Sequence, residues 1–167
     1  MRLFLLAVVL TSSAFAQKVQ IESDAAVDFT QFKTFAIRVQ RLNSKNPALN
    51  SELVKKQINA DIQKALTAKG LTFVESGASH LNVRYTLGAA QKSELEAYPA
   101  GWRGWGTRVV RVPYTEGTLV IDLRDPSTRS LVWRAIARED KSDASQVEGK
   151  LDDMVRKSIE KFPPKGK

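Results

Sequence analysis

Hydrophobic and polar residues alternate most regularly between residues 114 and 137. Leu119, Ile121 and Leu123 share one side of an extended chain. In a second extended segment, one side is shared by Leu131, Trp133, Ala135 and Ala137. A period of two that includes β-branched residues is typical of half-buried strands. Residues 125–128, between the two sets, are Asp-Pro-Ser-Thr, a composition that favours a tight turn. The pattern predicts a β-hairpin.

Shorter alternating segments predict further strands at residues 18–23, 34–39, 71–74, 79–87 and 108–112. Apolar residues at steps of three and four indicate two helices. The first begins at a cap formed by Asn50 or Ser51 and stops at Gly70, with a stripe of Val54, Ile58, Ile62, Ala65 and Leu66. The second begins at Ser145 and ends before prolines 163 and 164, with a stripe of Val147, Leu151, Met154, Val155, Ile159 and Phe162.

These elements predict an α+β fold, in which two main helices pack on one face of a mainly antiparallel β-sheet. A chain of 167 residues suits a single domain, which we expect over residues 17–164, followed by a loose tail at residues 165–167. The sheet side of the core should contain Leu81, Val83, Leu119, Ile121, Leu131 and Trp133.

Residues 88–106 follow neither period, and we expect them to form a loop. Tyr98, Trp102, Arg103 and Trp105 stand there among glycines. Glycine frees the backbone, while aromatic rings supply a large contact area. Residues 98–108 are therefore the candidate binding segment, for sugars, bases or a partner protein. The alternative is that these rings fold back over the edge of the sheet.

Residues 1–16 have the form of a secretory signal peptide, with one arginine, an apolar run and a closing Ala-Phe-Ala. An uncleaved amphipathic anchor is the alternative. We expect an exported bacterial protein of the periplasm or cell envelope. The chain has no cysteine, which excludes disulfides, thiolate ligands and a lipid anchor on cysteine.

The chain is basic, with a formal net charge of +8. Such a surface attracts polyanions, although excess lysine can also serve only to keep a protein in solution. Export argues against nucleic acid as the partner. The candidate partners are another envelope protein, an anionic polymer or a membrane surface.

The predicted hairpin resembles the signature of the domain of unknown function 4136 family. The resemblance is carried by residues 114–123, Asp125 and residues 131–134, and by weaker matches at residues 28–35, 69–70 and 162–164. It implies a bacterial envelope protein, commonly a lipoprotein, with helices on a mainly antiparallel sheet, and it implies no activity. This chain departs from the pattern twice: Gln17 stands where members often carry a lipidated cysteine, and His80 where an aspartate is common.

Two residues are candidates for catalysis, and each also has a structural interpretation. His80 is the one histidine of the chain and could act as a general base, or it could simply be solvated. Asp122 could be a catalytic carboxylate, or it could form a cross-strand ion pair with Arg134. A zinc site needs three or four protein ligands, which one histidine without cysteine does not supply. We predict no catalytic residue, no metal site and no cofactor.

The leading hypothesis is therefore a non-catalytic binding or structural module that uses residues 98–108. A hydrolase that uses His80 or Asp122 is one alternative. A basic peripheral protein that docks to an anionic membrane or polysaccharide is the other.

Overall fold

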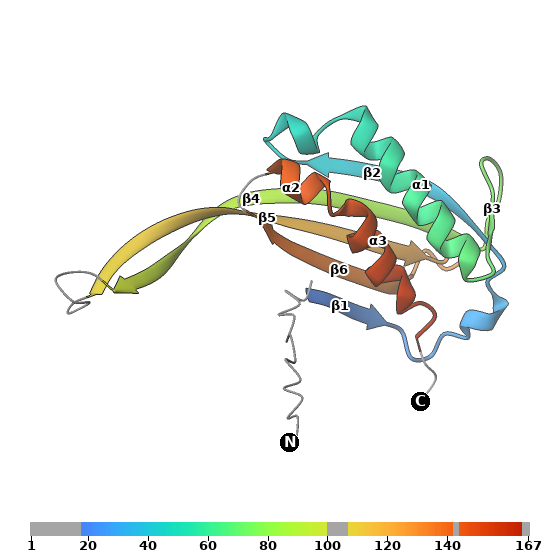
Figure 1. Cartoon of the computed structure of the whole chain (residues 1–167). Coiled ribbons are helices and arrows are strands. Elements are labelled where there is room, and N and C mark those ends of the chain that lie inside the picture. The colour runs from blue at the N-terminus through green and yellow to red at the C-terminus, as the bar shows by residue number, and fades with distance from the viewer. Residues whose placement is uncertain (1–17, 100–106, 142–143, 165–167) are drawn as a thin grey trace, which may run out of the picture.

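The computed structural model describes residues 18–99, 107–141 and 144–164, and within them six strands form one mixed sheet (Figure 1). The strands are β1 (Lys18–Ser23), β2 (Thr34–Asn43), β3 (Thr72–Phe73), β4 (Leu81–Pro99), β5 (Thr107–Arg124) and β6 (Leu131–Lys141). Their order is β1-β6-β5-β4-β2-β3. Strand β2 pairs in parallel with β4 and β3, and the other neighbours are antiparallel. The predicted α+β class is confirmed.

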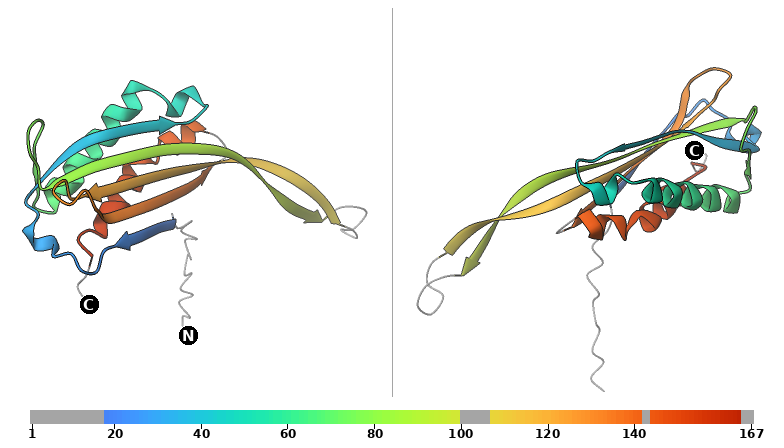
Figure 2. Two further views of the ribbon diagram at one scale, coloured as in Figure 1. Left: turned by 180° about the vertical axis from the view of Figure 1, so that it is seen from behind. Right: turned by 90° about the horizontal axis from the view of Figure 1, so that it is seen from above.

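The helices lie on one face of this sheet, as the views from the front and from above show (Figures 1 and 2). They are α1 (Glu52–Ala68), α2 (Ala144–Glu148) and α3 (Leu151–Glu160), with short 3₁₀ turns η1 (Phe29–Gln31) and η2 (Pro47–Leu49) in the connections. The Ser51 hydroxyl accepts a hydrogen bond from the amide of Val54, which caps α1. Gly70 ends the helix with a φ of 89°, as its position predicted.

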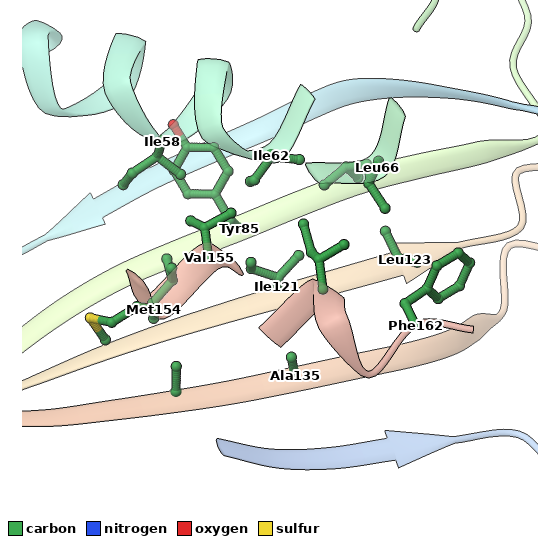
Figure 3. Packing of buried hydrophobic residues seen from close by; sticks show 14 of the residues in the cluster. Ile58, Ile62, Leu66, Tyr85, Ile121, Leu123, Ala135, Met154, Val155 and Phe162 are labelled. Carbon is green, nitrogen blue, oxygen red and sulfur yellow. The ribbon is translucent and has the colours of Figure 1, made fainter. Parts of the chain in front are cut away.

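The core forms where the helix stripes meet alternate residues of the central strands. Figure 3 shows Ile58, Ile62 and Leu66 of α1 and Val155 of α3 above Ile121 and Leu123 of β5. All of these side chains are fully buried. The hydroxyl of buried Tyr85 donates to the carbonyl of Lys55, so β4 is joined to α1 by a hydrogen bond within the core. Trp133 is buried against the edge of the Phe162 ring.

Two details of the predicted core are wrong. Leu131 is only half-buried, because a register shift between Leu123 and Arg124 pairs Leu131 with Arg124 and takes it out of the core-facing set. The predicted last helix is two helices, since the chain turns at Gly149 and Lys150 between α2 and α3. Its apolar stripe is nevertheless buried from end to end.

A glycine on β5 lets α2 approach the sheet closely. A Cβ atom placed on Gly117 would overlap the Cγ1 atom of Val147, which is fully buried on α2. Alanine or any larger residue at this position would force the helix away. Gly117 therefore sets the spacing between α2 and the sheet.

Strands β4 and β5 are far longer than the sequence predicted. We expected residues 88–106 to be a loop and residues 108–112 to be a short strand ending at Pro113. Instead β4 continues to Pro99, and β5 runs unbroken from Thr107 through Pro113 to Arg124. Prolines are tolerated at these positions because, among the described residues, no third strand pairs there with the outer edge of β4 or β5.

Candidate functional site

The extensions of β4 and β5 form a two-stranded arm that projects from the body (Figures 1 and 2). The β2 partner of β4 ends at the pair Asn43 and Gly88, and the β6 partner of β5 ends at the pair Thr115 and Lys141. Beyond these points β4 and β5 pair only with each other, up to Pro99 and Thr107. We call residues 92–99 and 107–114 the arm.

Both outer edges of the arm lack a neighbouring strand among the described residues. The backbone N–H and C=O groups on such edges are available to pair with another chain. A hydrogen bond from Gln91 Nε2 to Thr115 Oγ1, 2.8 Å long, links the two strands at the base. A hollow of about 420 Å³ lies beside that base, lined in part by Asn43, Ser44 and Ala89.

The arm also exposes apolar side chains. Leu95 is 65% exposed and Val109 is 59% exposed, and Leu53 on α1 is the other strongly exposed large hydrophobic residue in the described part of the chain. Isolated two-stranded ribbons are marginally stable in water, and an exposed apolar side chain on such a ribbon adds no stability through burial. The arm therefore offers both free edges and apolar contact area to a partner.

The structure places some of the predicted binding residues on this arm. Tyr98 belongs to β4 and is paired with Arg108 of β5, so the loop expected over residues 88–106 is wrong at Tyr98, while Arg108 lies in a strand as predicted. Trp102, Arg103 and Trp105 lie outside the described residues.

His80 lies away from the arm, immediately before β4. Its side chain is exposed, its Nδ1 atom is 2.8 Å from the hydroxyl of Thr34, and its amide donates to the same hydroxyl at 2.9 Å. These contacts tie the start of β4 to the start of β2. They give His80 a structural role in joining two strands.

Asp122 forms the predicted cross-strand ion pair. Arg134 lies opposite it on β6 and donates from Nε to Oδ1 at 2.7 Å and from Nη2 to Oδ2 at 2.9 Å. These hydrogen bonds raise the pKa of Arg134. Asp122 lines a hollow on the open face of the sheet, and His80 is not part of that lining. The structure therefore does not join the two candidate catalytic residues in one site.

Comparison with protein families identifies the chain. The family model described as a domain of unknown function (DUF4136) matches residues 19–164. The chain belongs to this family. The match covers all six strands of the DUF4136 domain except Lys18 at the start of β1, and its range includes both strands of the arm. Among curated proteins, comparison found no match.

Solved structures with low sequence identity share the fold. A PDZ domain protein from Parabacteroides distasonis is 18% identical with a TM-score of 0.60 over 89% of this chain, and the alignment spans 35% of that longer protein. The PelC dodecamer from Paraburkholderia phytofirmans is 13% identical with a TM-score of 0.51, over 86% of this chain and 95% of the PelC chain. At these identities the likeness shows a common fold and not a common function.

Other kinds of site receive no support within the described ranges. No group of three or more histidine, aspartate or glutamate residues there is arranged to hold a metal ion. No helix among the same residues is long and apolar enough to cross a bilayer.

Proposed function

We propose that this DUF4136 protein is a non-catalytic binding module of the bacterial envelope, which engages a partner protein through the end of its arm. The observation that carries the proposal is the arm itself, a two-stranded ribbon that leaves the sheet with both edges unpaired in the described structure. A ribbon of this kind adds little to the stability of the body. A contact with another molecule accounts for its length.

A protein partner fits the arm better than a soluble polymer does. Free strand edges are satisfied by another backbone, which adds as a further strand, and pockets for alternate side chains then give specificity. The exposed side chains of Leu95 and Val109 supply apolar contact beside those edges. Tyr98, Trp102, Arg103 and Trp105, at and beyond the end of the arm, supply the large aromatic and guanidinium groups that are enriched at protein interfaces.

A second copy of the same chain is one candidate partner. PelC, with which the fold is shared, was crystallised as a dodecamer. The envelope location follows from the signal-like residues 1–16, and the absence of cysteine argues against lipid anchoring.

Two arm variants test the proposal. The first is Trp102→Ala/Trp105→Ala. The second replaces residues 93–113 by Asn-Gly, a turn that closes a two-residue hairpin between Lys92 and Tyr114, which are directly opposite each other. Leu53→Ala is the matched control, because Leu53 is 74% exposed but lies on α1.

The measurements are affinity capture from periplasmic extract, with partners identified by mass spectrometry, and sedimentation of the purified protein for self-association. We expect both arm variants to lose the same partner or the same oligomer, and Leu53→Ala to keep it. Identical partners and identical sedimentation for the wild type and both arm variants would refute the role of the arm.

A further inference from the structure

The face of the sheet opposite the helices carries a band of basic residues. No helix or strand of the described chain covers this face, which Figure 2 shows from behind and in profile from above. Directly paired residues share a face, so the register places Glu22, Arg134, Asp122 and Arg84 in one row across four strands. The rows on either side add cations at Lys18, Arg41, Arg124 and Arg138. The next row towards the arm places the carboxylates Glu116 and Asp140 opposite each other, and Glu116 forms an ion pair with Lys92.

The two carboxylates of the central row, Glu22 and Asp122, both lie beside one arginine. Asp122 receives two hydrogen bonds from Arg134, and Glu22 lies opposite the same Arg134 on β1. The side chains of Arg41, Arg84 and Arg138 have no hydrogen-bond or ion-pair partner anywhere in the described structure. The band therefore has an excess of positive charge that the protein itself does not neutralise.

The band is hollowed at its centre. A depression of about 260 Å³ is lined by Arg41, Arg84, Arg124 and Arg134, and Asp122 is the one carboxylate in its lining. Pockets that enclose a whole small-molecule ligand usually measure about 300–1,000 Å³. A depression of this size accepts one charged group, and a longer ligand would continue over the neighbouring arginines.

We propose that this open face, with Arg41, Arg84, Arg124 and Arg138 around the Asp122–Arg134 pair, binds an acidic polysaccharide through its carboxylate groups. A guanidinium presents a planar fork of donors that matches a carboxylate with two parallel hydrogen bonds. Several such forks on neighbouring strands fit a polymer whose charges recur along its length. This site is separate from the arm and does not depend on the role proposed for it.

Charge and composition together select this polyanion over two others. Binding of single-stranded nucleic acid uses aromatic platforms on which bases stack, and the rows across this face contain no aromatic residue. Docking in a membrane interface uses apolar side chains that enter the lipid. The strongly exposed large hydrophobic residues of the described chain, Leu53, Leu95 and Val109, lie on α1 and the arm instead.

The test compares binding of alginate oligosaccharides to the wild type and to Arg41→Gln/Arg84→Gln by titration calorimetry at low salt. Lys56→Gln/Lys64→Gln is the matched control, because it removes the same charge from exposed positions on α1. Neutral dextran, oligo-dT and phosphatidylglycerol vesicles are the comparison ligands. Arg41→Gln alone is a second variant at an exposed position, where the fold is least affected.

We expect Arg41→Gln/Arg84→Gln to weaken alginate binding on the order of tenfold or more, because two charge-assisted contacts are lost. The control variant Lys56→Gln/Lys64→Gln should change the affinity less than about threefold. Arg41→Gln should give a smaller loss in the same direction, and the variant with the shortened arm should bind alginate like the wild type. Alginate binding no stronger than dextran binding, or an equal loss in the lysine pair, would overturn the proposal. The proposal would also be overturned if Arg41→Gln/Arg84→Gln lost more affinity for oligo-dT or for the vesicles than for alginate.

Discussion

Substitution of Gly117 by alanine should destabilise the protein, although glycine in a strand interior is usually unfavourable. The added Cβ would overlap Val147 Cγ1 and lie 3.4 Å from both Val147 Cβ and Cγ2. Val147 is fully buried and β-branched, so it has no other good rotamer in a helix. Either α2 moves away from β5 or the strand bends.

The magnitude follows from two opposed effects. Forcing an extra methyl into a packed core costs about 1–3 kcal/mol. Replacing glycine by alanine also restricts the unfolded chain, which returns roughly 0.4–1 kcal/mol. We expect Gly117→Ala to lower the free energy of unfolding by about 1–2 kcal/mol.

Gly88→Ala is the matched control for this experiment. Gly88 also lies in a central strand, but the nearest atom to a Cβ there is the carbonyl oxygen of Asn43 at 3.9 Å, an ordinary contact. This variant should be as stable as the wild type or up to about 1 kcal/mol more stable. Urea denaturation followed by circular dichroism gives the free energy of unfolding of each variant.

A double-mutant cycle identifies the cause of the effect. In a Val147→Ala background the obstructing methyl groups are absent, so Gly117→Ala should cost at least about 1 kcal/mol less than in the wild type. Equal stability of Gly117→Ala and Gly88→Ala would refute the close approach of α2 to β5. So would additivity of the Gly117 and Val147 substitutions.

Three further substitutions test the core and its electrostatics. Trp133→Ala should cost about 3–5 kcal/mol in urea denaturation, because it removes a fully buried ring packed on Phe162; a variant that unfolds like the wild type would remove Trp133 from the core. Tyr85→Phe should cost about 0.5–1.5 kcal/mol through loss of the hydrogen bond to Lys55, and no change would mean that this bond contributes nothing. Burial, and then the charge of Asp152, raise the pKa of Asp61. The folded protein therefore binds a proton at Asp61 more tightly than the unfolded chain does. For this reason the protein loses stability as the pH rises from about 3.8 through the raised pKa. Asp61→Asn should therefore raise the melting temperature at pH 7, with a gain that shrinks as the pH falls to that range; a gain that does not depend on pH would contradict this origin.

The body of the fold was predictable because its strands and helices each have one buried and one exposed face, which gives a periodic hydrophobic pattern. Strands β5 and β6 bury one face, so alternation revealed the hairpin and the pairing of Asp122 with Arg134. Helix α1 has both a capping serine and a terminal glycine, and both act as the sequence indicates. Leu131 was wrongly assigned to the core because of the register shift beside it. The shift places Leu131 on the face of the sheet opposite the core, and the alternation of residue types in the sequence does not reveal it.

The arm was missed because no third strand of the described chain pairs with it beyond its base. Leu95 and Val109 are exposed on it, so apolar residues there do not mark a buried face, and Pro99 and Pro113 are usually interpreted as strand ends. A sequence signal for the second strand of the arm was available in the β-branched valines at positions 109, 110 and 112, which follow the aromatic and glycine-rich segment. The basic open face was missed for a related reason. Its arginines are scattered in the sequence, and only the strand order brings them together.

Cross-linking in the arm tests the central claim most directly. Cysteines at positions 95 and 111 would face each other across β4 and β5, at the Cα separation of about 4.5–5.5 Å that directly opposite residues have and that a disulfide requires. The chain has no cysteine of its own, so each product is unambiguous. We predict rapid oxidation of the 95/111 pair and slow oxidation of a 95/109 pair, which is out of register by two residues. Equal rates for the two pairs, or no cross-link in either, would contradict the paired arm.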